Sequence, residues 1–155
     1  MAGLEDLYRE IILDHYRSPR NKGELETPPA VRTEGYNPLC GDEIVLFLQV
    51  DGDTVTDVKI GGQGCSISQS SASMMSAAIK GKTVAEVRAL VRAFKAMMDI
   101  HESRLEGAED AVPDPEVKLG DLEALQGVVK FPVRIKCATL SWNTLAQGLD
   151  EAAGA

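Results

Sequence analysis

The spacing of apolar residues along the first part of the chain predicts one helix followed by strands. Apolar positions at helical spacing indicate a helix over residues 4–16, which ends before Ser18-Pro19. Residues 43–50 and 55–60 are rich in β-branched and large apolar side chains, and the Asp51-Gly52-Asp53 sequence between them is typical of a hairpin turn. We expect two antiparallel strands here, with residues 31–36 as a third, short edge strand.

The following stretch predicts two helices. The glycine-rich run over residues 61–64 ends the hairpin, and a serine at position 66 or 68 can cap a helix that continues to Ile79. Thr83 and Glu86 form a capping box, which is typical of a helix N-terminus. Its apolar stripe, like the methionines of both helices, is expected to be buried in the core.

The C-terminal third is less regular. Residues 99–120 lose the helical pattern and contain two prolines, so we expect a loop there. Leucines over residues 119–125 indicate a short helix, and a last helix is expected to begin at Cys137. Taken together, the pattern predicts an α+β fold, a small antiparallel three-stranded sheet with helices packed on one face, in a single domain of residues 1–155.

Composition narrows the classes of function. The formal net charge of -8 argues against binding to nucleic acid or to anionic membrane surfaces, both of which need a basic face. No apolar run approaches the length of about 20 residues that spans a bilayer, and the N-terminus lacks a signal-peptide pattern. We therefore expect a cytoplasmic protein, in which three cysteines indicate metal binding or redox chemistry sooner than disulfides.

The cysteines stand at expected junctions between elements. Cys40 lies on a turn constrained by Pro38 and Gly41, with Asp42 two positions further on, and Cys65 follows the glycine-rich run. Cys137 is expected at the start of the last helix, where the partial positive charge of a helix N-terminus favours a thiolate. Three thiolates and one carboxylate suit zinc, and an iron–sulfur cluster would also accept them. Because no CxxC pair occurs, a zinc finger or ribbon is not indicated.

The residues alone leave other interpretations open. Isolated cysteines in a cytosolic protein are often small buried apolar residues, and Asp42 could be an ordinary turn carboxylate. A cysteine-protease site would need His15 or His101 as its base, but no local signature supports one, and both histidines are expected on the surface. The glycine run lacks the lysine of a phosphate-binding loop and is expected to form a turn.

Several motifs carry a resemblance to a known family. The sequences NPLCGD over 37–42, GQGCSIS over 62–68 and RIKCA over 134–138, with LYREIILDHY near the N-terminus, resemble the NifU/IscU-like iron–sulfur cluster assembly scaffold family. The resemblance implies a fold of the SufE/IscU type. Lys136 stands where the scaffold branch has histidine, and an inserted segment covers roughly residues 101–127. Both features resemble the SufU branch.

That resemblance implies a function and a set of residues. It implies that Cys40, Asp42, Cys65 and Cys137 ligate zinc, and that Cys40 is a transient sulfur carrier that accepts persulfide sulfur from a cysteine desulfurase of the SufS type. Downstream iron–sulfur assembly proteins would be further partners.

Supporting roles and alternatives follow from the same resemblance. Gly41 would give the loop room to move, and Arg134 and Lys136 would steady the anionic site or meet an acidic partner surface. The alternatives are a scaffold that assembles a [2Fe-2S] cluster on iron, and a docking protein whose zinc is purely structural. Whether a sulfur carrier of this kind counts as an enzyme stays open.

Overall fold

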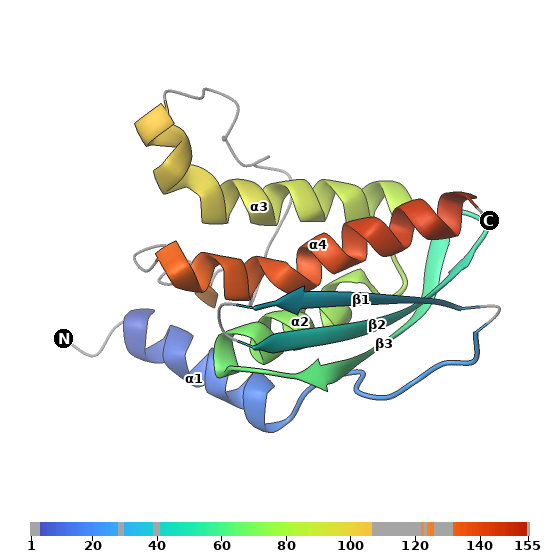
Figure 1. The fold of residues 1–155 in the computed structure, drawn as a ribbon, viewed down its shortest axis with the longest axis horizontal. Coiled ribbons are helices and arrows are strands. Elements are labelled where there is room, and N and C mark those ends of the chain that lie inside the picture. Colours follow the sequence, from blue (N-terminus) through green and yellow to red (C-terminus); the bar gives the residue numbers. More distant parts are fainter. Residues whose placement is uncertain are drawn as a thin grey trace.

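The computed structural model describes residues 4–27, 30–38, 41–106, 122, 124–125 and 132–154. The chain begins with helix α1 (Leu4–Arg17) and continues through strands β1 (Val31–Asn37), β2 (Asp42–Asp51) and β3 (Thr54–Gln63). Three further helices follow, α2 (Ser66–Ile79), α3 (Val84–Glu106) and α4 (Pro132–Gly154) (Figure 1). The predicted α+β fold is therefore confirmed, with the three predicted strands in place.

The sheet is antiparallel with β2 in its centre, in the order β1-β2-β3. Leu48 of β2 lies opposite both Val31 of β1 and Val58 of β3. Along β2 the apolar residues Ile44, Leu46 and Leu48 are buried on one face, because side chains of a strand alternate between the two faces of its sheet. A register shift between Gln49 and Val50 interrupts the pairing near the hairpin turn.

The helices cover the buried face of the sheet. Helix α4 packs on β1 and β2, while α2 packs on β3 and against α4. Helix α3 lies on α4, on the side away from the sheet (Figure 1). Trp142 of α4 occupies the centre, with its ring stacked on Phe94 of α3 at a centroid distance of 4.4 Å. Its indole Nε1–H donates to Ser71 Oγ of α2 at 3.1 Å, and this hydroxyl donates to the Ala138 carbonyl.

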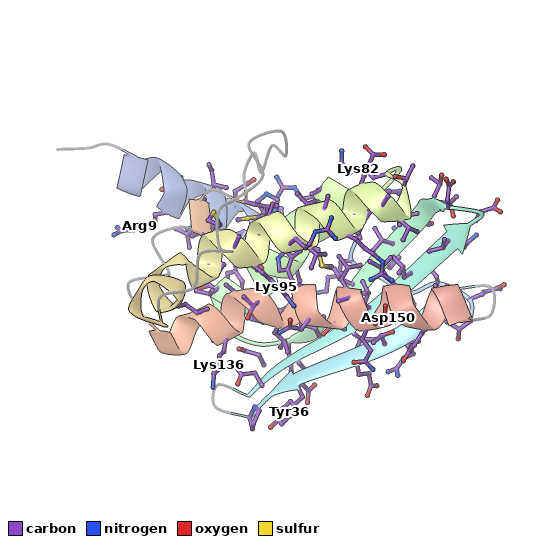
Figure 2. All side chains as sticks on the ribbon, turned by 90° about the horizontal axis from the view of Figure 1, so that it is seen from above. Arg9, Tyr36, Lys82, Lys95, Lys136 and Asp150 are labelled. Carbon is purple, nitrogen blue, oxygen red and sulfur yellow. The ribbon has the colours of Figure 1, made fainter. Side chains whose placement is uncertain are left out.

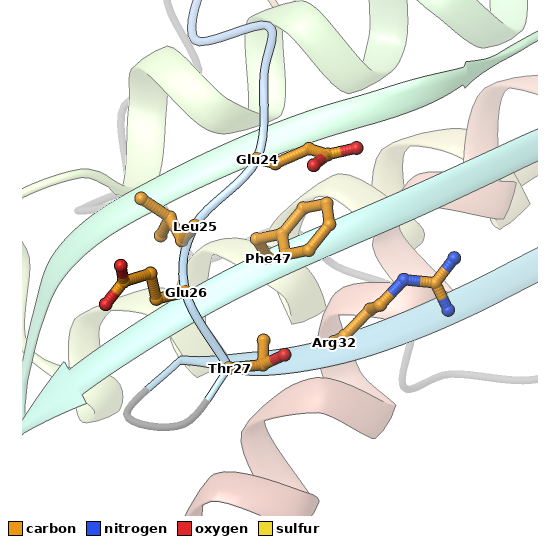
Figure 3. Close-up of a pocket in the computed structure, with 6 residues that line it drawn as sticks. All are labelled: Glu24, Leu25, Glu26, Thr27, Arg32 and Phe47. Atoms are coloured by element: carbon orange, nitrogen blue, oxygen red, sulfur yellow. The ribbon is translucent and has the colours of Figure 1, made fainter.

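The segment after α1 extends the sheet and then crosses its outer face. Ile60 of β3 donates its N–H to the carbonyl of Asn21 and accepts from the N–H of Gly23. Residues 24–27 then run over Phe47 and form an open pocket of about 500 Å³ together with Arg32 (Figure 3). The pocket thus lies on the face opposite to the helices.

The predicted start of the loop at residue 99 and the predicted surface position of His15 were wrong. Helix α3 continues to Glu106, so the predicted loop over 99–120 does not begin at residue 99; residues 107–120 lie outside the described ranges. His15 is buried, with 3% of its surface exposed, because α1 packs on α2 and Nδ1 of His15 lies 2.8 Å from Ser73 Oγ. The side chain of His101 lies outside the described part.

Other predictions have mixed outcomes. The methionines of α2 and α3 are core residues, as expected. In the predicted short helix, Leu122, Ala124 and Leu125 are buried and in 3₁₀ conformation, and its other residues lie outside the description. Among the helices of the described ranges, none is long and apolar enough to cross a membrane. That residues 1–155 form a single domain stays a prediction.

Candidate metal centre

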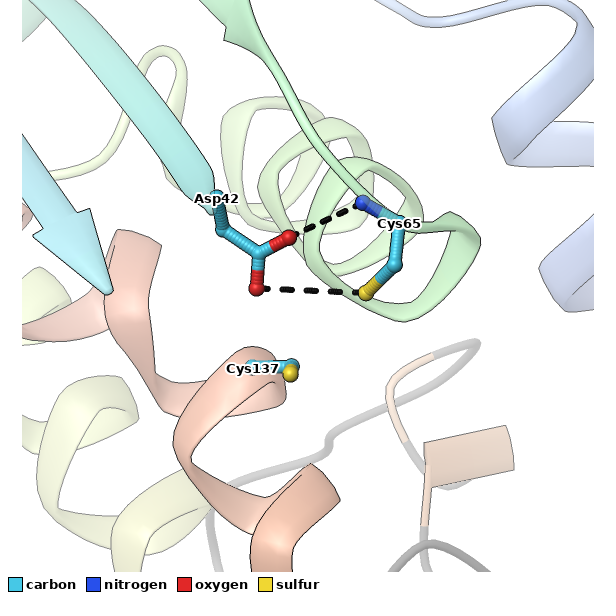
Figure 4. Close-up of side chains that lie close together, drawn as sticks. All are labelled: Asp42, Cys65 and Cys137. Carbon is cyan, nitrogen blue, oxygen red and sulfur yellow. Dashed lines mark hydrogen bonds between the residues drawn. The ribbon is translucent and has the colours of Figure 1, made fainter. Parts of the chain in front are cut away.

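Three predicted ligands meet at one point of the fold. The ligand atoms of Asp42, Cys65 and Cys137 all lie within 4.8 Å of one another (Figure 4). Asp42 is the first residue of β2, Cys65 immediately precedes α2, and Cys137 belongs to α4. Three elements far apart in sequence thus converge as predicted. Cys40, the fourth predicted ligand, lies outside the described residues.

Asp42 is held in place by the backbone next to Cys65. The carboxylate is completely buried, with 0% of the residue exposed. Its Oδ1 accepts the Cys65 N–H at 2.9 Å, and its Oδ2 faces Cys65 Sγ at 3.9 Å. Gly64 makes this approach possible, because a Cβ at that position would lie 2.5 Å from Oδ1. A buried carboxylate with one fixed oxygen is well placed to ligate a cation through the other.

Cys65 is itself the N-cap of α2, where a serine at position 66 or 68 was predicted. Its sulfur accepts the Ser68 N–H at 3.4 Å. The first N–H groups of a helix have no partner within the helix, and together they carry a partial positive charge. Both effects direct N–H groups toward the Cys65 sulfur, which suits an atom that ligates a metal. The predicted link between this thiol and a helix N-terminus is therefore confirmed, with the cap assigned to the wrong residue.

Cys137 does not open the last helix, which corrects another prediction. Helix α4 begins at Pro132, and proline suits a first helical position because the N–H it lacks would have no helical partner there. Cys137 therefore lies in the second turn, beyond the strongest effect of the helix dipole. It is completely buried, and Nδ2 of Asn37 donates to its Sγ at 3.8 Å.

The supporting residues of the prediction are only partly described. Gly41 has φ +68°, the left-handed region that glycine tolerates best, and a Cβ there would meet nothing within 4 Å. Lys136 is exposed and projects from the first turns of α4, at the same end of the view as the exposed Tyr36 (Figure 2). The side chain of Arg134 lies outside the described part of the chain.

The donor set fits a zinc ion. Two thiol sulfurs and one carboxylate oxygen are ligands that zinc accepts, and a tetrahedral site has room for a fourth. A cysteine protease would instead need a cysteine–histidine pair, and the cluster in the described residues pairs cysteines with a carboxylate.

Sequence reasoning missed two residues that shape this centre. The sequence analysis assigns no role to Asn37, the first residue of the NPLCGD motif, and predicts only a turn at Gly64. The signal for Gly64 was its position directly before a candidate ligand, but only the folded chain shows how close Asp42 comes.

The fold and this cluster define a small α+β protein with a thiol- and carboxylate-lined candidate metal centre. Residues 7–138 match the family model of the NifU-like N-terminal domain. The chain therefore belongs to the NifU-like N-terminal domain family, which confirms the resemblance seen in the motifs.

Individual relatives agree with this assignment. The chain is 48% identical to the zinc-dependent sulfurtransferase SufU of Bacillus subtilis, over 99% of this chain and 96% of that protein. It is 38% identical to the iron–sulfur cluster assembly scaffold protein IscU of Streptococcus pyogenes, over 100% of this chain and 90% of the relative. A solved structure described as an iron–sulfur cluster assembly scaffold protein for the SUF system, from Fervidobacterium islandicum, superposes with a TM-score of 0.78 at 36% identity, covering 95% of this chain and 99% of that one.

Proposed function

We propose that this protein is a zinc-dependent sulfur acceptor, which takes persulfide sulfur from a cysteine desulfurase of the SufS type for iron–sulfur cluster assembly in the cytoplasm. The observation that carries the proposal is the convergence of Asp42, Cys65 and Cys137 from three separate elements. The nearly full-length similarity to a relative named zinc-dependent sulfurtransferase supports it.

Four side chains would hold the ion. Asp42, Cys65 and Cys137 supply the clustered ligand atoms, and Cys40 is proposed as the fourth from its place in the NPLCGD motif. Bound zinc would keep its cysteine ligands as thiolates at neutral pH. Gly41 lies between Cys40 and Asp42, has a left-handed backbone conformation and has free space where a Cβ would be. These properties suit a loop in which one ligand must move.

The proposed sulfur transfer is a thiol–persulfide exchange. The Cys40 thiolate attacks the terminal sulfur of the persulfide on the desulfurase, so that a new S–S bond forms on Cys40 while the S–S bond on the desulfurase breaks. The desulfurase cysteine leaves as a thiolate, and no external oxidant or reductant is needed. The burial of Cys137 favours Cys40 in this role, since a buried sulfur is poorly accessible to a partner protein.

Docking of the desulfurase is proposed to use the basic residues before Cys137. Lys136 is exposed one position before this ligand, on a chain whose formal net charge is -8. A positive charge at the rim of the site would attract an acidic surface of the partner and speed its association. Arg134 is proposed to share this role from its position in the sequence.

The test is a desulfurase assay with and without this protein. The wild type is expected to raise the rate of sulfide or alanine release, whereas Cys40→Ala should abolish the stimulation while the circular dichroism spectrum stays native. Incubation with the desulfurase and cysteine should place a persulfide on Cys40, detected by peptide mass spectrometry. A desulfurase whose own active cysteine is replaced provides the control that yields none. Persistent stimulation by Cys40→Ala would refute the transfer.

A second candidate function is assembly of a [2Fe-2S] cluster on the same ligands. Relatives named as cluster assembly scaffolds favour it, including the Streptococcus pyogenes protein. Protein purified without chelator separates the two proposals: about one zinc per chain is expected for the sulfur acceptor, and iron with visible absorption for the scaffold. A persulfide on Cys40 would in turn exclude a docking protein with a purely structural zinc.

A further inference from the structure

Asn37 lies beside the candidate metal centre and contacts one of its three clustered residues, Cys137. It is the last residue of β1 and pairs with Asp42, the first residue of β2. The two residues therefore flank the connection between these strands, residues 38–41. Both side chains are buried on the helix-covered face of the sheet, because directly paired residues of two strands point to the same side. From there Asn37 Nδ2 donates to Cys137 Sγ at 3.8 Å.

This contact ties two elements of the centre together. Asp42 is fixed to Cys65 through the Cys65 N–H, and Asn37 is fixed to Asp42 through the strand pairing. The bond from Asn37 to Cys137 adds α4 to the same assembly. The positions of all three clustered ligands are thus linked through hydrogen bonds that the described residues make.

An amide donor also matches the chemistry of a buried thiolate. Cys137 is completely buried, and both Ala138 after it and Ile135 two positions before it belong to the core. A charged sulfur in such surroundings is costly unless N–H groups solvate it. An N–H···S bond withdraws electron density from the sulfur and lowers its nucleophilicity while it fixes the direction of the sulfur's lone pairs.

We infer that Asn37 is a positioning residue of the metal centre, whose side-chain amide holds Cys137 as a fixed ligand that does not take up sulfur. The inference deepens the proposed function and rests on its metal site. It assigns different tasks to the cysteines: Cys137 is a fixed ligand, bonded and enclosed, and the uptake of sulfur is left to Cys40, as in the proposed function. The motifs assign no role to Asn37 and give no means by which Cys137 is held in place.

The first test compares two substitutions on the buried face of β1. Asn37→Leu keeps the branched shape and the number of heavy atoms of the side chain, and it removes the donor. Thr33→Val is the matched control, because Thr33 is equally buried and its hydroxyl donates to Glu151 Oε2 of α4, away from the three ligands. Zinc affinity is measured by competition with a chromophoric chelator. Asn37→Leu should weaken it by about 10-fold to 100-fold, the usual effect of losing a hydrogen bond to a metal ligand, and Thr33→Val should leave it unchanged.

A spectroscopic signature separates positioning from a merely structural role. With Co²⁺ in place of zinc, loss of the N–H···S bond should shift the thiolate-to-metal charge-transfer band of Asn37→Leu to lower energy. A residue that only completes the hairpin would not move this band. An unchanged affinity and band in Asn37→Leu would overturn the inference.

A measurement on the wild type covers the case in which Asn37→Leu does not fold. A spin-active cadmium isotope bound in place of zinc should show a scalar coupling to the side-chain amide protons of Asn37, transmitted through the hydrogen bond and the sulfur. Cadmium binding without this coupling would overturn the role of Asn37 and leave the metal site standing. Failure of the wild type to bind zinc, cobalt or cadmium would overturn both the inference and the proposed function.

Discussion

At the scale of single residues, the geometry of the metal centre depends on what is absent as much as on the ligands. Gly64 has no side chain, and this lets the backbone before α2 approach the Asp42 carboxylate so that the Cys65 N–H reaches Oδ1. The carboxylate is thereby fixed before any ion arrives. Preorganised ligands bind a metal more tightly than ligands that must first be ordered.

Gly64→Ala is expected to weaken zinc binding by about 10-fold or more, because the new Cβ would displace Oδ1 and with it an orienting hydrogen bond. Gly61→Ala is the matched control. A Cβ there would lie 3.9 Å from Val45 Cβ, an ordinary contact, and should leave the affinity unchanged. Chelator competition measures both variants, and equal affinities would contradict this view of Gly64.

Lys136→Ala should lower the stimulation of the desulfurase mainly through a higher KM for the partner, since an exposed charge acts on association sooner than on the transfer step. Added salt should reduce the difference from the wild type. Lys82→Ala removes another exposed lysine, which Figure 2 shows at the opposite end of the view, and should behave as wild type. Equal KM values for both variants would argue against a docking role of Lys136.

The sequence predicted which side chains cluster better than it predicted their surroundings. Asp42, Cys65 and Cys137 could be named because their motifs resemble those of a family, and the structure brings these three together. The cap at Cys65 and the burial of His15 could not be predicted, because both depend on polar contacts in the folded chain. Periodicity reports which face of a helix is buried and says little about which polar groups pair there.

At the scale of elements, the contact between α2 and α4 positions two of the clustered ligands. Cys65 caps α2 and Cys137 lies within α4, so any slip between these helices would separate the two sulfurs. The buried hydroxyl of Ser71 links them, since it accepts from Trp142 Nε1–H and donates to the carbonyl of Ala138. A core polar bridge of this kind fixes register as well as adding stability.

Ser71→Ala should reduce the free energy of unfolding by about 1–3 kcal/mol, because it leaves the buried Trp142 N–H without its acceptor. Ser70→Ala is the comparison, since the Ser70 hydroxyl donates only to the Ile67 carbonyl of its own helix among the bonds described for it. Urea unfolding of both variants measures the difference. A Ser71→Ala protein no less stable than Ser70→Ala would contradict the bridge.

The start of α3 carries a measurable pH dependence. Hydrogen bonds from the Thr83 N–H and hydroxyl lower the pKa of Glu86 below its ordinary value of 4.5. A carboxylate with a lowered folded pKa stabilises the protein fully above the unfolded pKa, and this contribution is lost as the pH falls through the folded value. The melting temperature of the wild type should therefore exceed that of Glu86→Gln near neutral pH, with a gap that narrows below pH 4.5. A difference in melting temperature that stays constant across this pH range would contradict the lowered pKa of Glu86.

The same capping box shows why element order was predictable. Thr83 and Glu86 are local signals, as is the Asp51-Gly52-Asp53 turn, and both lie where the sequence places them. The ends of α3 and α4 were predicted poorly, because the last turns of α3 contain charged residues and α4 begins with Pro132 and Val133. Charged residues give a weak local signal for a helix end, so packing decides where α3 stops. Pro132 is a signal for a helix start that the prediction of a start at Cys137 did not use.

At the scale of the whole molecule, one ion would join the sheet, α2 and α4 at a single point. A ligand that binds only the folded state stabilises it in proportion to the logarithm of its concentration over Kd. Bound zinc would therefore stabilise the fold as well as serve the sulfur transfer. The acidic net charge does not oppose this, since a cation meets a favourable overall field. Function and fold would then depend on the same four side chains.

The most direct measurement is a zinc-edge anomalous difference map from crystals of the protein purified without chelator. A single peak is predicted within bonding distance of Cys40 Sγ, an Asp42 carboxylate oxygen, Cys65 Sγ and Cys137 Sγ. A map with no peak among these atoms, or with the zinc bound elsewhere, would contradict the account.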